Sequence, residues 1–256
     1  MLSALSAIQR VWNTTCPIHR LPTEVLVHIF SLVPERCPVS RDLPERNYWP
    51  FTLPAVDIHI QLAKVCKHWR NLILDTPALW SAVSESKVIN SLIPNMWHLA
   101  RCPRGPLSVH FVREVSPRMW SLLEGEGHRV QQLHMSYIPV DHGEAMLALL
   151  QTFHANQLEH CKIDISLPED NRDGLLSLFS GGGKNLRSLY LCRVRFLPSN
   201  VFPRLSCLIL DLAYYHENPH WDLEDLSNFL AGSPGLENLH LSQVWSRGGL
   251  HPPKGS

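Results

Sequence analysis

Leu186-Arg187-Ser188-Leu189-Tyr190-Leu191 is the stretch of sequence that decides the fold of the second half of the chain. Its phrase, Leu-x-x-Leu-x-Leu, begins again at Leu205 and Leu236, and weaker copies begin at Val130 and Leu158. Successive starting residues differ by 28, 28, 19 and 31 positions. Recurrence of a short apolar phrase at such spacing indicates a structural repeat with one strand in each copy.

Helical patterns lie between these strands, over residues 141–150, 175–181 and 222–232. Asp141 and Asp222 are the candidate N-caps of the first and third helices. Alternation of strands with helices predicts parallel strands, and the spacing is close to the 20–29 residues of leucine-rich repeats. The sequence therefore predicts an irregular α/β leucine-rich-repeat-like solenoid arc over residues 84–256.

The repeats depart from a regular array in two ways. Val194, Ala213 and Val244 stand where a regular repeat places Asn or Cys, so the side-chain ladder that makes such arrays uniform is missing. The last strand, near residues 236–245, is followed by a short polar stretch that is a poor capping helix. We expect either a bare final repeat or an array truncated at its C-terminal end.

The N-terminal part contains a first helix that begins near Pro22 and Glu24. Proline suits the first helical position, and a negative charge suits the first turn. Apolar residues between Val25 and Val33 cover an arc of roughly 220°, whereas a surface helix needs an apolar stripe of about 100°. One neighbouring element cannot bury so wide a face.

A second apolar pattern runs from Ile58 to Ile73 at helical spacing and is one-sided, which predicts one helix that packs inward. Pro77 then ends it, and Asp75 or Thr76 can cap a new helical turn. The resulting unit has about three short helices and is marginally stable alone. From periodicity alone, either a partner or the rest of the chain could cover the surplus face of the first helix.

Three blocks of this region resemble F-box-like proteins, especially the expanded fungal set. They are Leu-Pro-x-Glu-Val-Leu-x-x-Ile-Phe from Leu21, Val-Cys-Lys-x-Trp-Arg-x-Leu-Ile from Val65, and Thr-Pro-x-Leu-Trp from Thr76. The resemblance implies a three-helix F-box over residues 18–82 that binds the Skp-type adaptor of a cullin-RING (SCF-type) ubiquitin ligase. It also implies that the rest of the chain selects an unknown protein substrate.

Carried over by position, ten residues would form the adaptor-binding site or its support. They are Leu21, Pro22, Leu26, Ile29, Phe30, Val65, Cys66, Trp69, Leu79 and Trp80. In this picture Leu21 and Pro22 contact the adaptor, Ile29 and Phe30 lie behind them, and the later five divide between the domain core and the adaptor groove.

Residues 34–56 depart from the family pattern because five prolines predict a long loop inserted between the first two helices. Tyr48, Trp49 and Phe51 in this insert either form a docking patch or pack on the helices. Residues 1–17 are an N-terminal extension that could contain a short amphipathic helix.

Composition limits the partners. Lys and Arg number 23 and Asp and Glu also number 23, and no basic run interleaves with aromatic residues, so neither a nucleic acid nor a membrane is favoured. Seven cysteines form no CxxC pair, which fits reduced thiols in the cytoplasm or nucleus better than disulfides or zinc. No segment has the length and composition of a signal peptide or a membrane span.

No catalytic, cofactor or metal motif occurs, and Gly183-Lys184-Asn185 fails the phosphate-loop pattern. We therefore expect a noncatalytic receptor without cofactors. The alternatives are a protein-interaction scaffold with a degenerate F-box and, less favoured, an enzyme in the α/β region. Strand positions that alternate with the leucines would face the substrate, and the candidates are Arg187, Ser188, Tyr190, Asn238 and His240.

Overall fold

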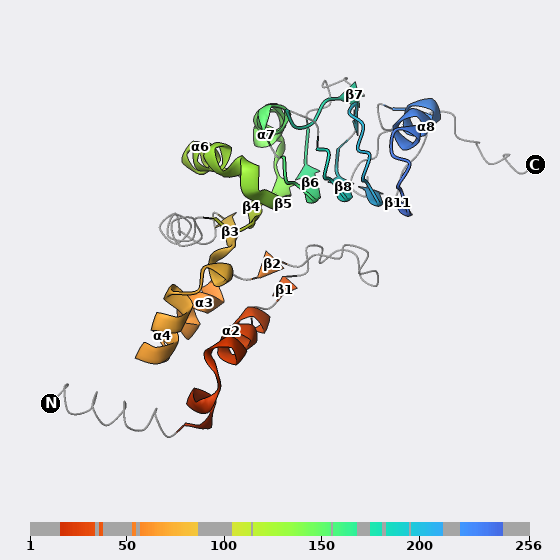
Figure 1. Ribbon diagram of the computed structural model, residues 1–256. Helices are drawn as coiled ribbons and strands as arrows, with labels where there is room; N and C mark the ends of the chain where they lie inside the picture. The colour runs from red at the N-terminus through yellow and green to blue at the C-terminus, as the bar shows by residue number, and fades with distance from the viewer. Residues whose placement is uncertain are drawn as a thin grey trace, which may run out of the picture. The chain divides into compact units, whose positions relative to one another are not determined.

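The computed structural model describes residues 16–33, 36–37, 53–54, 57–86, 104–113, 115–154, 156–167, 175–180, 183–194, 196–211 and 221–242. The chain divides into two compact units, the first of residues 1–82 and 96–105 and the second of residues 83–95 and 106–256. Figure 1 shows the first as a helical unit in red to orange and the second as a sheet with helices in yellow-green to blue. The predicted mixture of an N-terminal helical region with a later α/β region is confirmed.

The first unit consists of short helical elements. They are the 3₁₀ helix η1 (Pro17–Arg20), α2 (Thr23–Leu32), α3 (Asp57–Leu62), α4 (Lys67–Leu74) and the 3₁₀ helix η2 (Pro77–Trp80). Leu26 and Phe30 of α2, Ile73 of α4, and Leu79 and Trp80 of η2 form its buried core. The Trp80 indole N–H donates a 2.7 Å hydrogen bond to the carbonyl of Ile73, which fixes η2 against α4.

The second helical pattern forms two helices, so the prediction of one continuous helix is wrong. The chain turns between α3 and α4, and Cys66, in extended conformation, is the N-cap of α4. Its Sγ accepts a hydrogen bond from the backbone N–H of Trp69 at 3.4 Å. Because of this break, Val65 is 59% exposed. Its spacing had predicted that it packs inward with the other apolar residues between Ile58 and Ile73.

The described residues of the proline-rich insert form two short strands. Strands β1 (Arg36–Cys37) and β2 (Leu53–Pro54) pair antiparallel and bring its two ends together. The expectation that residues 34–56 hold no regular structure is wrong at these four positions. Tyr48, Trp49 and Phe51, like the N-terminal extension up to residue 15, lie outside the described residues.

Seven strands of the described chain form one sheet in the second unit. They are β3 (Ala82–Ser86), β4 (Leu107–Val112), β5 (Val130–Ile138), β6 (His160–Ile165), β8 (Ser188–Cys192), β10 (Cys207–Asp211) and β11 (Asn238–Ser242). They follow one another across the sheet in chain order (Figure 1). From β4 to β11 every pair of neighbours is parallel, as the alternation of strands and helices predicted.

The repeated apolar phrase is in register across these strands. Its second positions face one another in the order Leu133, Cys161, Leu189, Leu208 and Leu239. Its third positions do the same in the order Met135, Ile163, Leu191, Leu210 and Leu241. All five copies therefore occupy equivalent places in one sheet.

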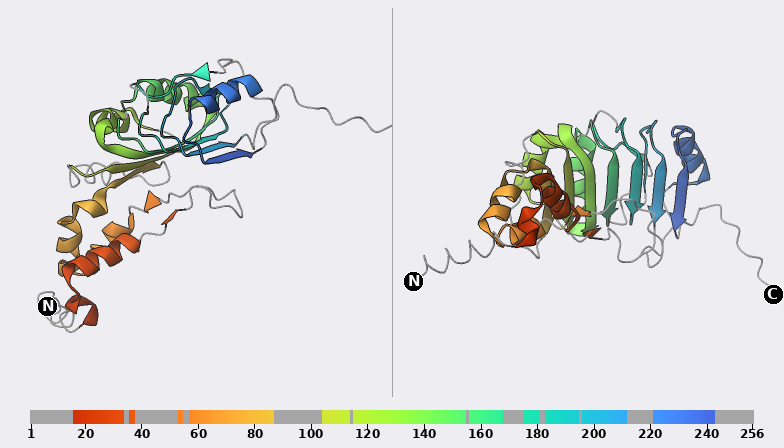
Figure 2. Two further views of the ribbon diagram at one scale, coloured as in Figure 1. Left: turned by 45° about the vertical axis from the view of Figure 1, so that its right-hand side comes forward. Right: turned by 60° about the horizontal axis from the view of Figure 1, so that its bottom comes forward.

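Helices cover one face of this sheet. Figure 2 shows α6 (Pro117–Glu126), α7 (Val140–Thr152) and α8 (Leu223–Ala231) on the same side of the strands. The ring of Phe111 on β4 lies 6.4 Å from that of Trp120 on α6, between centroids. Because Phe111 pairs with the third phrase position of β5, the phrase residues point toward the helices.

Two details of the predicted helices are wrong and one is confirmed. Helix α7 begins at Val140 after Pro139, so Asp141 lies in its first turn and caps nothing. Leu175–Leu176 is a strand, β7, which pairs with β9 (Leu197–Pro198) and leaves no helix there. In contrast, α8 begins with a capping box between Asp222 and Asp225 and ends at Gly232, as predicted.

Candidate functional site

An exposed apolar stripe on α2 is the main surface feature of the first unit. Val25 is 42% exposed and Leu32 is 58% exposed, and their spacing of seven places them on the same side of the helix. Leu21, immediately before the helix, is 37% exposed. The buried residues of α2, Leu26 and Phe30, point elsewhere, so the helix is apolar on more sides than the unit covers.

Four of the ten predicted residues lie in the core of the unit. Leu26 and Phe30 are at most 1% exposed, and Leu79 and Trp80 are at most 5% exposed. They cannot contact a partner while the unit is folded as described. Their part in the site is to hold α2 and η2 in place.

The remaining predicted residues are partly or fully accessible. Pro22 and Val65 are exposed, while Ile29, Cys66 and Trp69 are half-buried. The ring of Trp69 meets that of Phe30 edge-on at 4.8 Å between centroids, which joins α4 to α2.

His19 extends this cluster. Its ring lies 6.2 Å from that of Trp69, and its Nε2 lies 3.6 Å from the Sγ of Cys66. The structure thus joins the end of η1 to the start of α4.

Val25 and Leu32 were missed as site residues. The signal was present, because Val25 and Leu32 are seven residues apart, which is the spacing of one helix side. Separating this side from the buried one requires the packing of α4 and η2, which the local sequence of α2 does not contain.

The face of the sheet opposite the helices is called here the polar face. The middle positions of the phrase form one row across it, namely His110, His134, Lys162, Tyr190, Ile209 and His240. Lys162 Nζ lies 4.9 Å from the centre of the Tyr190 ring. The Tyr190 hydroxyl donates to the Asp211 carboxylate at 3.2 Å.

A second polar cluster lies where the strands of this face end. The Asp164 carboxylate accepts hydrogen bonds from the backbone N–H of Tyr137 at 3.2 Å and from the Arg193 guanidinium at 2.5 Å. Arg193 also donates to the hydroxyl of Ser166 at 2.8 Å. Asp164 on β6 thus ties Tyr137, near the end of β5, to Arg193, which follows β8.

Burial controls the charge of the histidines in this region. Desolvation, with a smaller effect of Lys162, lowers the pKa of His110 to about 4. Desolvation, with a smaller effect of Arg187, lowers the pKa of His160 to about 4. Burial, with smaller effects of His110, Lys162 and His160, also lowers the pKa of His134 well below its ordinary value. All three imidazoles are therefore neutral at pH 7 in the folded chain.

The predicted substrate-facing residues are not equally accessible. Arg187 and Asn238 are exposed and His240 is half-buried. Tyr190 is 2% exposed and Ser188 is 4% exposed, so the expectation that both side chains are open to a partner is not met. Arg187 lies just before β8 and pairs with Glu159 at 3.6 Å, at the edge of the sheet where the strands begin.

The model of the F-box-like family matches residues 18–86 of this chain. These residues form an F-box-like domain. The match spans α2, α3, α4 and η2, and so includes the exposed stripe of α2 and the core behind it. Comparison with curated proteins and with solved structures gives no match.

F-box domains generally bind Skp-type adaptors and are typically noncatalytic. The F-box-like domain therefore points to a role in binding the adaptor of an SCF-type ubiquitin ligase. Within the described parts of the chain, no helix is long and apolar enough to cross a membrane. The same residues contain no group of three His, Cys, Asp or Glu side chains that could hold a metal ion.

Proposed function

We propose that this protein is the substrate-recognition subunit of an SCF-type ubiquitin ligase. Its F-box-like domain, over residues 18–82, binds a Skp-type adaptor and through it a cullin. The region from residue 84 to 256 binds the protein to be ubiquitinated. The observation that supports this most directly is the exposed apolar stripe Leu21, Val25 and Leu32 within the family match.

Burial energetics favour a protein partner on this stripe. Full burial of a Val or Leu side chain is worth roughly 1.5–3 kcal/mol. Covering the exposed parts of Leu21, Val25 and Leu32 therefore contributes on the order of 2–3 kcal/mol to association. Pro22 and Val65 are also exposed apolar residues of the domain, and they extend the contact that we propose for the adaptor.

The proposed mechanism is proximity and needs no catalytic residue in this chain. Holding a substrate lysine near a charged conjugating enzyme makes the transfer step effectively intramolecular. The two units supply the two ends of this link. One holds the adaptor, and the other holds the substrate.

The proposal for the second unit is a degenerate leucine-rich-repeat array. Its support is the register of the five phrases and the order of the strands along the sheet. Repeat arrays of this kind offer long surfaces to protein partners. Arg187, Asn238 and His240 are proposed substrate contacts on exposed or half-buried positions, whereas Tyr190 supports the sheet from a buried position.

The test is capture of purified Skp-type adaptor, alone and in complex with cullin, by the intact chain. The variants Leu21→Ala/Pro22→Ala and Val25→Glu/Leu32→Glu remove the stripe while leaving the core residues unchanged. We expect each to weaken adaptor binding by about tenfold or more, which corresponds to about 1.4 kcal/mol. Leu223→Glu is the matched control, because Leu223 is 62% exposed on α8 of the other unit.

The outcomes separate the two functions that the sequence left open. Capture of both adaptor and cullin by the intact chain, lost in the stripe variants, supports the ligase receptor. Capture of adaptor without cullin indicates a scaffold outside any ligase. A folded chain that captures no adaptor contradicts the proposal and indicates a degenerate F-box.

A further inference from the structure

A tight turn precedes each of the last three strands of the sheet. Hydrogen bonds from the N–H of Leu186 to the carbonyl of Gly183, from Leu205 to Phe202, and from Leu236 to Ser233 close these turns. In each case the apolar residue that closes the turn is the first residue of the repeated phrase. The turns therefore recur at one edge of the sheet, where the strands begin, and side chains on them are brought into a row.

The turn before β8 needs a glycine at position 183, for its backbone conformation and for the space around it. The φ of Gly183 is +37°, in the region that favours glycine. A Cβ atom at this position would lie 2.8 Å from a ring carbon of Phe202. The glycine therefore allows the turn to approach the neighbouring repeat closely, and Lys184 and Asn185 follow at the surface.

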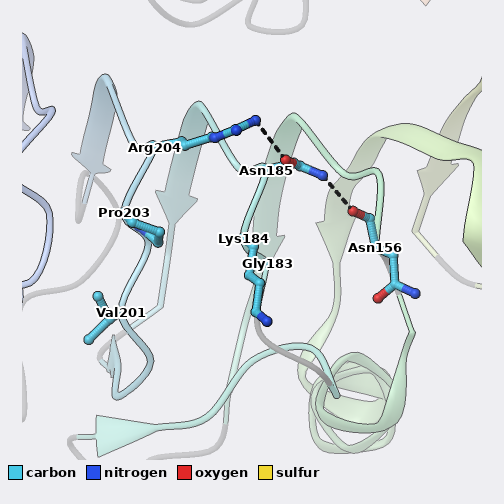
Figure 3. A pocket seen from close by; sticks show the side chains of 7 residues that line it. All are labelled: Asn156, Gly183, Lys184, Asn185, Val201, Pro203 and Arg204. Carbon is cyan, nitrogen blue, oxygen red and sulfur yellow. Dashed lines mark hydrogen bonds between the residues drawn. The ribbon is translucent and has the colours of Figure 1, made fainter.

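Two side chains and one backbone carbonyl from three successive turns form a hydrogen-bonded chain along this edge. Arg204 Nη1 donates to Asn185 Oδ1 at 3.0 Å, and Asn185 Nδ2 donates to the carbonyl of Asn156 at 2.8 Å. Figure 3 shows the two bonds in line, from the turn before β10 to the turn before β6. One hydrogen bond orients the guanidinium of Arg204 and leaves most of its five N–H donors for another acceptor.

These turns line an open groove of about 740 Å³. Its lining consists of Asn156, Gly183, Lys184, Asn185, Val201, Pro203 and Arg204 (Figure 3). Lys184 and Arg204 are the charged members of this set, and both are exposed. Among the described residues neither has a carboxylate partner, whereas Arg187 on the same edge is paired with Glu159.

We infer that this groove binds an acidic segment of a protein partner. Two cations that have no carboxylate partner among the described residues, one of them held by Asn185, provide charge complementarity to closely spaced Asp or Glu side chains. The Asn156 and Asn185 side chains offer hydrogen bonds to a peptide backbone. Val201, which is 59% exposed, and Pro203 offer apolar contact to the stems of its side chains.

The groove fits a peptide better than a nucleic acid. Protein–DNA complexes of useful affinity typically neutralise 6–10 phosphates, and this groove supplies two cations. The chain as a whole carries no net formal charge, with Lys and Arg equal in number to Asp and Glu. A role of this groove as the docking place of the ubiquitination substrate rests on the proposed receptor function. Binding of an acidic peptide, in contrast, is measured without adaptor or cullin.

The experiment measures fluorescence anisotropy of a labelled peptide of eight Glu and Asp residues added to the full chain. The comparison peptide has Gln and Asn in place of Glu and Asp. We expect the acidic peptide to bind more tightly than the neutral one, and its affinity to fall when salt is raised from about 0.05 M to 0.5 M, because salt screens exposed charges. Lys184→Gln/Arg204→Gln should weaken its binding by about tenfold.

Two further variants complete the design. Arg113→Gln removes an exposed cation from the opposite edge of the sheet, where β4 ends, and it should leave the affinity within about twofold. Asn185→Ala keeps both charges but frees Arg204, and it should weaken binding by about two- to threefold while the salt dependence stays. Circular dichroism spectra and unfolding curves identify any variant whose fold is altered.

Three results would overturn the inference. These are equal affinity for the neutral peptide, equal loss of affinity in Arg113→Gln and Lys184→Gln/Arg204→Gln, and tighter binding of an eight-nucleotide DNA strand than of the acidic peptide. The last would identify the groove as a nucleic-acid site. Because no adaptor is present, failure here leaves the adaptor-capture result unaffected, and the two proposals fail separately.

Discussion

Asp164 is the residue on which the polar face most depends. It is 3% exposed and accepts hydrogen bonds from the Arg193 side chain and from the Tyr137 backbone. Arg193 and Tyr137 both have positive φ values, of 56° and 59°. A buried carboxylate therefore holds two backbone positions in a conformation that non-glycine residues adopt at a cost of roughly 1–2 kcal/mol.

We expect Asp164→Ala to lower the free energy of unfolding by about 3 kcal/mol or more, because it leaves the Arg193 guanidinium without its carboxylate. Urea unfolding of the full chain measures this change. Arg187→Ala is the matched control, since its ion pair with Glu159 is exposed and should be worth less than about 1 kcal/mol. A loss for Asp164→Ala as small as that of the control would show that the buried pair does not stabilise the sheet.

At the level of elements, the apolar side chains of β11 are more exposed than those of the strand before it, β10. Leu239 and Leu241 are 39% and 48% exposed, whereas Leu208 and Leu210, their partners on β10, are at most 3% exposed. The same apolar phrase therefore occupies a buried place in β10 and an open place in β11. Sequence identity at equivalent positions does not give equal burial.

This difference predicts unequal effects of one substitution. Leu210→Ala should cost about 3 kcal/mol of unfolding free energy, because it leaves a cavity in a packed layer. Leu241→Ala should cost less than about 1 kcal/mol, since the side chain is already half in water. Urea unfolding of both variants gives the comparison, and equal losses would contradict the open position of β11.

The sequence predicted those elements whose determining residues lie within the element itself, at its ends, or in each copy of a repeated phrase. The five phrases gave strands in the correct register because each copy carries its own apolar positions, and α8 was correct because Asp222 and Gly232 mark its ends. The break before α4 was missed because a cysteine thiol caps it. The strand at Leu175–Leu176 was missed because its partner lies about twenty residues later.

The site was predictable to a similar degree. The motif selected Leu21, which is 37% exposed, but it could not separate the exposed residues of α2 from buried ones such as Leu26 and Phe30. The polar pair Asp164 and Arg193 joins residues 29 positions apart, and no spacing rule connects them. Contacts of this kind become visible only when the order of the strands is known.

For the molecule as a whole, the buried histidines predict sensitivity to acid. His110 and His160 have pKa values of about 4 in the folded chain and an ordinary value of 6.5 when unfolded. Between pH 6.5 and 4 the unfolded chain therefore binds more protons than the folded chain, so the free energy of unfolding falls as the pH falls. Above pH 6.5 both states are neutral at these sites and the effect vanishes.

The measurement is the unfolding free energy from urea titrations at pH 7 and pH 5. Each such histidine contributes a loss of up to about 1.4 kcal/mol per pH unit in this window. The variant His110→Gln/His160→Gln should lose less stability than the parent chain between the two pH values. An identical loss in both would show that other groups control the response to acid.

Cys161, Cys192 and Cys207 lie on three adjacent strands of the sheet, β6, β8 and β10, and each is free and buried. Burial raises the pKa of all three thiols, and thiols react with alkylating reagents as thiolates. Cys16 is free and exposed, so it reacts without any opening of the structure. Each strand thus carries its own chemical probe, and mass spectrometry of partly alkylated chains would reveal the order in which neighbouring repeats open.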